Sequence, residues 1–127
     1  MNRSYIKLIL ISFLFNSCYK QLELKGFDKR QWVNSKGTCS TYRMEIAEHI
    51  IANEKLLLEA TQNEIESLLG QAEEHELYER NQKFFHYRLT PSDSCENYEV
   101  KSFLSVRFNA IGRANLVQIM LRDPSTK

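Results

Sequence analysis

The sequence predicts an α+β domain in which two N-terminal helices pack on one face of an antiparallel meander sheet of three or four strands. Three observations favour this fold class. Apolar residues recur at spacings of three and four within residues 42–69, as in amphipathic helices. Apolar and polar residues alternate within residues 76–121, as in strands with one buried face. Short polar connections between the alternating segments favour antiparallel neighbours. Helices followed by a sheet form two packed layers, so we expect one domain over residues 39–122.

The two predicted helices cover residues 42–54 and 62–69. The second is the better marked, because Thr61 and Glu64 have the spacing of a capping box, in which each side chain bonds the backbone amide of the other residue. Gly70 follows this helix, and glycine commonly ends helices. A helix of two turns is not stable alone in water. We therefore expect the second helix to dock on the sheet.

Four segments form the predicted sheet, and they cover residues 76–80, 83–90, 101–110 and 114–121. A tight turn at residues 81–82, a polar loop at residues 91–97 and a turn at residues 111–112 connect them. Alternation places one set of side chains on a common buried face: Phe85, Tyr87, Leu89, Leu104, Val106, Phe108, Val117, Ile119 and Leu121. Residues 123–127 are expected to form a tail.

The N-terminus has the features of a secretory signal. Arg3 and Lys7 are basic, and residues 8–15 that follow are apolar apart from Ser12. Eight residues are too few to cross a bilayer as a helix, which takes about 20. A charged start, a short apolar middle and small or polar residues after it are typical of a cleaved signal. We expect residues 1–17 to be removed on export.

Cys18 directly follows Phe15, Asn16 and Ser17. This order resembles the lipobox of bacterial lipoproteins, in which the cysteine is acylated and becomes the mature N-terminus. The resemblance implies that residues 18–38 contain the lipidated cysteine, a tether and an irregular arm. Two or more acyl chains anchor a protein stably in a membrane. The alternatives are an ordinary cleaved signal with an incidental cysteine, and a hydrophobic N-terminus that stays buried in the protein.

The chain has three cysteines, and an odd number in a secreted protein needs an explanation. If Cys18 carries lipid, Cys39 and Cys95 remain as a pair that can form a disulfide in an oxidising compartment. Such a bridge would close a loop of more than fifty residues and stabilise the fold by about 4 kcal/mol in the chain-entropy model. The alternative is two unrelated thiols, since a bridge requires Cα atoms within about 7 Å.

Composition and motifs argue against several function classes. Without Arg3 and Lys7 the mature chain has 15 basic and 16 acidic residues, so its charge gives no case for a nucleic-acid partner. No nucleophile elbow of the G-x-S-x-G type occurs, and four glycines form no phosphate-binding loop. We expect no catalytic residue and no cofactor, and we predict that the protein is not an enzyme.

Two sets of residues bear on metal binding. His75 and Glu76 begin a stretch similar to the zinc motif H-E-x-x-H, but Glu79 replaces the second histidine and the stretch is predicted as loop and strand rather than helix. The second set consists of the other cysteines and histidines that could bind zinc, and no two of them have the spacing of zinc fingers or ribbons: Cys39, His49, His86 and Cys95. We expect no metal site.

The outward face of the predicted sheet combines aromatic, arginine and polar side chains. The second and third strands contribute Phe84, His86, Arg88, Phe103, Ser105 and Arg107. Aromatic residues and arginine are enriched at protein interfaces, so this patch is a candidate interface. The alternative is that the N-terminal arm, with Phe27 and Trp32, folds over this face and buries it.

Three segments carry a resemblance to a known family. They are LLEATQNEIESLLG at residues 57–70, the strand that holds Phe85 and Tyr87, and VRFNAIGRANLVQI at residues 106–119. Together with the lipobox and the order of elements, they resemble the BamE/SmpA family of small outer-membrane lipoproteins. That family shares its helix-helix-sheet architecture with the repeated units of β-lactamase inhibitory protein. The stretch LYERNQKFFHY is more similar to small lipoproteins of this type whose role is unknown.

The resemblance implies a lipid-anchored protein of the outer membrane of a Gram-negative bacterium, facing the periplasm. Its expected function is that of a non-catalytic scaffold or protein-interaction module that binds another envelope protein during outer-membrane protein assembly. The alternative is an inhibitor-like module that occludes a periplasmic enzyme. A third class, a ligand-binding or catalytic domain, would need a buried pocket lined by polar groups.

Overall fold

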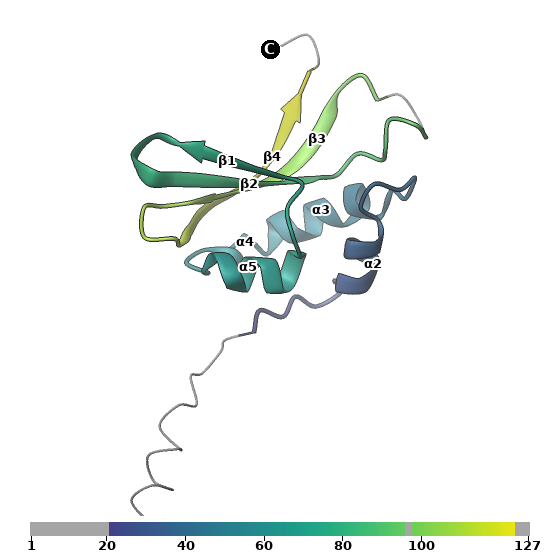
Figure 1. Ribbon diagram of the computed structural model, residues 1–127. Helices are drawn as coiled ribbons and strands as arrows, with labels where there is room; N and C mark the ends of the chain where they lie inside the picture. The colour runs from purple at the N-terminus through teal and green to yellow at the C-terminus, as the bar shows by residue number, and fades with distance from the viewer. Residues whose placement is uncertain (1–20, 96–97, 124–127) are drawn as a thin grey trace, which may run out of the picture.

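The computed structural model describes residues 21–95 and 98–123 (Figure 1). The predicted signal, the lipidation residue Cys18 and most of the predicted tail lie outside these residues. The helices are α2 (Lys29–Asn34), α3 (Tyr42–Ala52), α4 (Glu54–Leu57) and α5 (Gln62–Leu69). The strands are β1 (Glu74–Tyr78), β2 (Gln82–Arg88), β3 (Lys101–Phe108) and β4 (Ala114–Arg122), with a short 3-10 helix η2 (Glu79–Asn81) between β1 and β2.

The α+β class and the antiparallel sheet are confirmed. The four strands pair in the order β1-β2-β3-β4, and each neighbouring pair is antiparallel. The expectation of two helices is wrong in number, and not every helical segment precedes the sheet. Four α-helices precede the sheet within the described residues, and the helical turn η2 lies inside it. Asn53 ends α3 and also begins α4, so the predicted helix at residues 42–54 is one helix followed by a separate turn.

The strand boundaries differ from the prediction mainly at the first hairpin. Strand β1 begins at Glu74 rather than at residue 76, and the connection covers η2 rather than residues 81–82. Arg80 and Asn81 have φ angles of 59° and 61°, in the left-handed region. Asparagine tolerates this conformation, but arginine gives no such signal. The sequence therefore placed the turn one or two residues too late.

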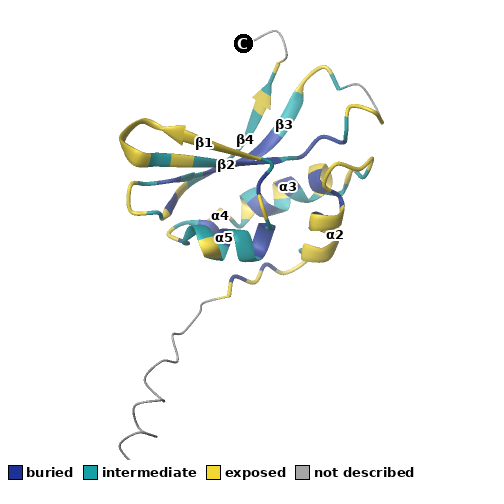
Figure 2. Cartoon of the chain, viewed as in Figure 1, coloured by how far each residue is buried: buried dark blue, intermediate teal, exposed yellow. Residues whose placement is uncertain are grey.

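A single core joins the helices and the strands. It contains fully buried side chains from α2 to α5 and from β2 and β3, among them Trp32, Ile50, Leu57, Ile65, Tyr87, Leu104, Val106 and Phe108. In Figure 1 the helices lie on one side of the sheet, and Figure 2 shows the buried residues where the two layers meet. Val117 also joins this core, whereas Leu121 near the end of β4 is exposed although alternation predicted it as buried.

Helix α5 has the ends that the sequence predicts. The amide of Glu64 donates to Thr61 Oγ1 at 3.2 Å, and the amide of Thr61 donates to Glu64 Oε1 at 3.3 Å, which completes the capping box. Gly70 follows with a φ of 73°. A Cβ at Gly70 would lie 3.2 Å from Val33 Cγ2, so glycine also permits the close approach of α2.

The N-terminal arm packs into the core on the helix side. Leu22, Leu24 and Trp32 are buried, and the ring centroids of Trp32 and Tyr87 lie 6.2 Å apart. Phe27 packs beside Trp32, with ring centroids 5.7 Å apart. The alternative in which Phe27 and Trp32 cover the outward face of the sheet is therefore wrong. Within the described residues, buried side chains occur as early as Leu22, ahead of the predicted domain start at residue 39.

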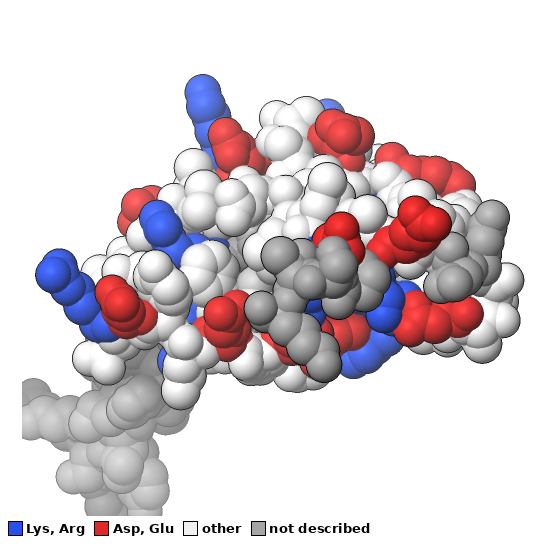
Figure 3. Space-filling view, turned by 90° about the horizontal axis from the view of Figure 1, so that it is seen from above, with Lys and Arg blue, Asp and Glu red and all other residues white. Residues whose placement is uncertain are grey.

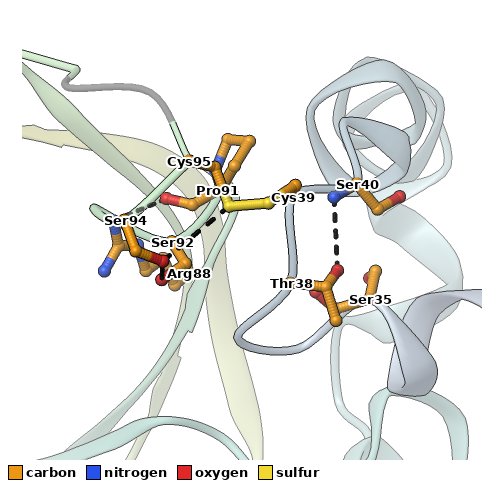
Figure 4. Close-up of a disulfide and its surroundings, with 9 residues drawn as sticks. All are labelled: Ser35, Thr38, Cys39, Ser40, Arg88, Pro91, Ser92, Ser94 and Cys95. Atoms are coloured by element: carbon orange, nitrogen blue, oxygen red, sulfur yellow. Dashed lines mark hydrogen bonds between the residues drawn. A yellow bond between two sulfur atoms is a disulfide. The ribbon is translucent and has the colours of Figure 1, made fainter.

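Cys39 and Cys95 lie at disulfide distance, as the cysteine count predicts. Their Cα atoms are 5.5 Å apart, which is a usual separation for a bridge. Figure 4 shows the two sulfurs joined between the loop that precedes α3 and the loop that follows β2. A backbone hydrogen bond from Ser92 N to Thr38 O, 3.0 Å long, holds the same two loops together.

Candidate interaction face of the sheet

The sheet has a second face, opposite the helices, which we call the outer face. Strand register places on it Glu74, Glu76, Tyr78, Phe84, His86, Arg88, Phe103, Ser105, Arg107, Leu116, Gln118, Met120 and Arg122. No helix of the described part of the chain lies over this face (Figure 1). Seen from the sheet side in Figure 3, acidic and basic side chains are scattered among uncharged ones.

The structure brings together the six residues of the predicted interface. In the pairing of β2 with β3, Phe84 lies opposite Arg107, and Arg88 lies opposite Phe103. His86 lies between them, opposite Ser105. His86 and Phe103 are nevertheless buried, so solvent reaches mainly Phe84, Arg88 and Arg107, each of which is half-buried.

His86 is buried by hydrogen bonds and by aromatic neighbours. Its Nδ1 lies 2.7 Å from Ser105 Oγ, and its Nε2 lies 2.7 Å from Glu76 Oε2. The rings of Phe84 and Phe103 flank the imidazole at centroid distances of 5.6 and 6.3 Å. Both ring nitrogens therefore have partners. In the tautomer that has its hydrogen on Nε2, the ring donates to Glu76 Oε2 and accepts a hydrogen bond from the Ser105 hydroxyl at Nδ1.

The order serine, histidine, carboxylate is also that of hydrolase triads. Ser105 is only 1% exposed, however, and its hydroxyl is already bonded to His86. A nucleophile has to contact its substrate, and Ser105 lies beneath the side chains around it. The network holds the imidazole of His86 beside the rings of Phe84 and Phe103 on the outer face.

Arg122 covers Phe103 and ties the two edge strands of the sheet together. Its Nη1 and Nη2 each donate to one carboxylate oxygen of Glu74, both at 3.0 Å. The guanidinium carbon lies 4.6 Å from the centroid of the Phe103 ring, a cation-π distance. The hydrogen bonds from Arg122 lower the pKa of Glu74, and those to Glu74 raise the pKa of Arg122.

Arg88 is directed toward the loop after β2. Its Nε donates to Thr90 O at 3.0 Å, and its Nη2 donates to Pro91 O and to Asp93 Oδ1, both at 2.7 Å. Lys101 also binds Asp93, at 3.0 Å. The hydrogen bond from Arg88, which has the larger effect, and the hydrogen bond from Lys101 both lower the pKa of Asp93. With its guanidinium held in this way, Arg88 is a poor candidate for binding a partner directly.

Exposed apolar side chains gather at the hairpin end of the sheet. The β1-β2 and β3-β4 connections lie at the same end in Figure 1, and Figure 2 shows β1 exposed along its whole length. Leu77 is 80% exposed and Ile111 in the β3-β4 connection is 81% exposed. Tyr78 is half-exposed and contacts Phe84 edge-on at a centroid distance of 5.7 Å. We call Leu77, Tyr78, Phe84 and Ile111 the hairpin-end group.

Sequence reasoning missed several residues that shape this face. Glu74 and Arg122 lie just outside the predicted strand limits of 76 and 121, so alternation was not extended to them. Glu76 begins the predicted first strand, but the only chemistry expected of it is that of a stretch similar to a zinc motif. Extending the period-two pattern beyond the predicted limits places Glu74 and Arg122, together with Glu76, on the same face as His86.

Neither a metal site nor a membrane-spanning helix is found in residues 21–95 and 98–123. His75 and Glu76 are neighbours in a strand, so their side chains point to opposite faces and cannot share an ion as they would on a helix. The chain matches no protein-family model, no curated protein and no solved structure.

Proposed function

We propose that this chain is a lipid-anchored, non-catalytic interaction module of the Gram-negative cell envelope. Cys18 carries the anchor in the outer membrane, and the domain faces the periplasm and binds an envelope protein in outer-membrane protein assembly. The observation that carries the proposal is the hairpin-end group beside an outer face that no described helix covers.

The composition of this surface supports a protein partner. Tyr78 and Phe84 are aromatic, and Arg107 lies opposite Phe84 on the outer face. Leu77, on the opposite face of β1, and Ile111, in the β3-β4 connection, add exposed apolar area at the same end of the sheet. Aromatic residues and arginine are enriched at interfaces between proteins. Single exposed leucines are common on protein surfaces, so the evidence for an interface is the group of side chains and not any one of them.

The surface is also held in place before a partner arrives. Tyr78 contacts Phe84, Phe84 stacks on His86, and His86 is hydrogen-bonded on both sides. Side chains that are already ordered lose less conformational entropy on binding. The His86 network thus favours binding without contacting the partner.

The sequence resemblance to the BamE/SmpA family supports the choice of compartment and partner class. The lipobox-like segment that ends at Cys18 supports the anchor, and the segments that resemble the family include strand β2 and the β3-β4 hairpin. Outer-membrane barrel assembly is accordingly the process in which we expect the partner.

Site-specific crosslinking in membranes tests this proposal. A photoreactive phenylalanine analogue replaces Tyr78 in one variant and Phe84 in another, and the control variant carries it at Met44 on α3, on the helix side. We expect components of the barrel-assembly machinery to be crosslinked from positions 78 and 84 but not from 44. Recovery of no such component from either position, or equal recovery from all three, would contradict the proposal.

A second candidate function is suggested by the two projecting connections. Leu77 and Ile111 lie near the tips of neighbouring hairpins and are almost fully exposed, an arrangement that can enter the cleft of an enzyme. On this alternative the chain inhibits a periplasmic hydrolase. If the wild-type protein inhibits a hydrolase on titration and the variants Leu77→Ser and Ile111→Ser do not, this alternative is favoured. If the wild-type protein leaves the activity unchanged, the alternative is excluded for that enzyme.

A further inference from the structure

A cavity of about 200 Å³ lies away from the hairpin-end group, next to the Cys39–Cys95 bridge. Its lining includes Ser35, Lys36, Ser40, Arg43, Glu73 and Thr90. One wall comes from the segment between α2 and α3 together with Arg43 of α3. The other comes from Glu73, the end of β2 and the loop after β2 (Figure 4). Sites for drug-sized ligands usually measure about 300 to 1,000 Å³, so this one suits a smaller molecule.

Thr90 has a buried hydroxyl that the rest of the protein does not satisfy. The side chain is only 6% exposed, and its Oγ1 has no hydrogen-bond partner among the described residues. Buried polar atoms are paired in the large majority of cases, because an unpaired one costs desolvation free energy. Thr90 lines the cavity, and its Oγ1 is closed to solvent in this conformation, so a ligand in the cavity bonds to the hydroxyl once the side chain turns toward it.

Arg43 contributes a buried guanidinium that is only partly used. Its Nε donates to Trp32 O at 3.0 Å and to Ser35 Oγ at 3.1 Å, and its Nη1 binds Glu73 and Arg88 O. The guanidinium also lies over the Trp32 ring, 4.5 Å from the centroid. These bonds leave Nη2 as the nitrogen with donors to spare.

The charge balance of the lining favours an anion. Glu73 neutralises Arg43, and Asp93 neutralises Arg88. Lys36 also lines the cavity and forms no ion pair within the part of the chain that the structure describes. One positive charge is thus in excess.

We propose that this cavity binds a small monoanionic carboxylate. Its oxygens accept hydrogen bonds from the Thr90 hydroxyl and from Nη2 of Arg43, and Lys36 balances its charge. A carboxylate has the two acceptor oxygens that these donors require. The cavity shares Arg88 with the outer face but lies away from the hairpin-end group, so this proposal does not depend on the identity of the proposed partner.

The Cys39–Cys95 bridge holds the two walls of the site. Cys39 lies between Thr38 and Ser40 on one wall, and the opposite loop carries Ser92 and Cys95 (Figure 4). The bridge and the bond from Ser92 N to Thr38 O fix the spacing of the walls. Binding of the carboxylate is therefore expected to weaken when both cysteines are replaced by serine.

Acetate and the variant Thr90→Val test the proposal on the full chain in detergent. Valine has nearly the shape of threonine and lacks the hydroxyl. We expect sodium acetate to raise the Tm of the wild type above that in sodium chloride at equal ionic strength, with one site by calorimetry. Thr90→Val should raise the Kd for acetate at least tenfold and should match or exceed the wild-type Tm without acetate, because the unpaired hydroxyl is gone.

Two control variants complete the experiment. Thr41→Val removes an exposed hydroxyl that bonds to Glu45, and it should keep the wild-type response to acetate. Lys36→Gln should weaken acetate binding, whereas Lys55→Gln on α4 should not. The proposal would be overturned by any of three results: no effect of acetate on the wild type, an undiminished effect on Thr90→Val, or binding of phosphate but not of acetate.

Discussion

The indole N–H of Trp32 donates to the backbone carbonyl of Leu69 at a distance of 2.9 Å, inside the core. Leu69 is the last residue of α5, where carbonyls have no partner within the helix. Trp32 therefore caps the C-terminal end of α5, although it lies more than thirty residues earlier in the sequence. The arm before residue 39 is part of the fold on this account.

Replacing Trp32 should severely destabilise the protein. We expect Trp32→Ala to lower the free energy of unfolding by about 3 to 5 kcal/mol, because it leaves a large cavity and an unpaired carbonyl. Arg30→Ala, at an exposed position of the same helix, should change it by no more than about 0.5 kcal/mol. Denaturant titration of both variants provides the comparison, and similar midpoints would contradict a core role for the arm.

The sequence could not predict α2, which holds Trp32. A six-residue helix with one buried residue shows no apolar period. Its start depends on Asp28, whose Oδ1 accepts the Gln31 amide at 3.1 Å, and aspartate is common in loops as well as at caps. By contrast, α5 was predictable because its capping box and its Gly70 are local signals. Long-range packing, rather than propensity, orders the arm.

The candidate face was predictable in its register but not in its burial. Alternation is a property of one strand, so it correctly placed Phe84, His86 and Arg88 on a common side. The burial of His86 depends on Glu76 and Ser105 from the two neighbouring strands. Only the pairing of three strands reveals that contact, and no local pattern in the sequence encodes it.

The His86 network should contribute measurably to stability. Ser105→Ala removes the partner of Nδ1 and leaves a buried ring nitrogen unpaired, which should cost about 1 to 3 kcal/mol. Ser102→Ala on the same strand is the matched control, since Ser102 is half-buried and faces the other side of the sheet. Thermal or denaturant unfolding at pH 7 measures both, and equal stabilities would show that the network is not supporting the face.

The Cys39–Cys95 pair should be oxidised in protein isolated from the envelope. Peptide mapping by mass spectrometry without reduction should recover the two cysteines in one linked fragment. Replacing both with serine should lower the free energy of unfolding by about 4 kcal/mol, because the bridge restricts a long loop of the unfolded chain. Two free thiols in the mapping experiment would refute the bridge.

Membrane association should depend on Cys18. Without this cysteine no acyl chain can be attached, and the described residues contain no helix that could cross a membrane. We expect Cys18→Ala to move the protein from the membrane fraction to the soluble fraction of cells, while Cys39→Ser with Cys95→Ser leaves it in the membrane fraction. Unchanged fractionation of Cys18→Ala would mean that the lipobox interpretation is wrong.

Acid should weaken the link between the two edge strands. Hydrogen bonds from Arg122 lower the pKa of Glu74 in the folded protein below its ordinary value of 4.5. The unfolded chain therefore binds this proton more readily, so the pair stabilises the fold above pH 4.5 and the contribution is lost as the pH falls through the folded pKa. The pair is partly exposed, which limits its contribution at pH 7 to about 1 kcal/mol or less.

Glu74→Gln should accordingly be less stable than the wild type at pH 7, and the difference should shrink as the pH falls below 4.5. Stability curves at pH 7 and at decreasing acidic pH values measure this difference. Glu48→Gln is the control, because Glu48 is exposed and forms no ion pair among the described residues. If the Glu74→Gln difference stayed constant over this range, the carboxylate charge would not be what holds Arg122 over Phe103.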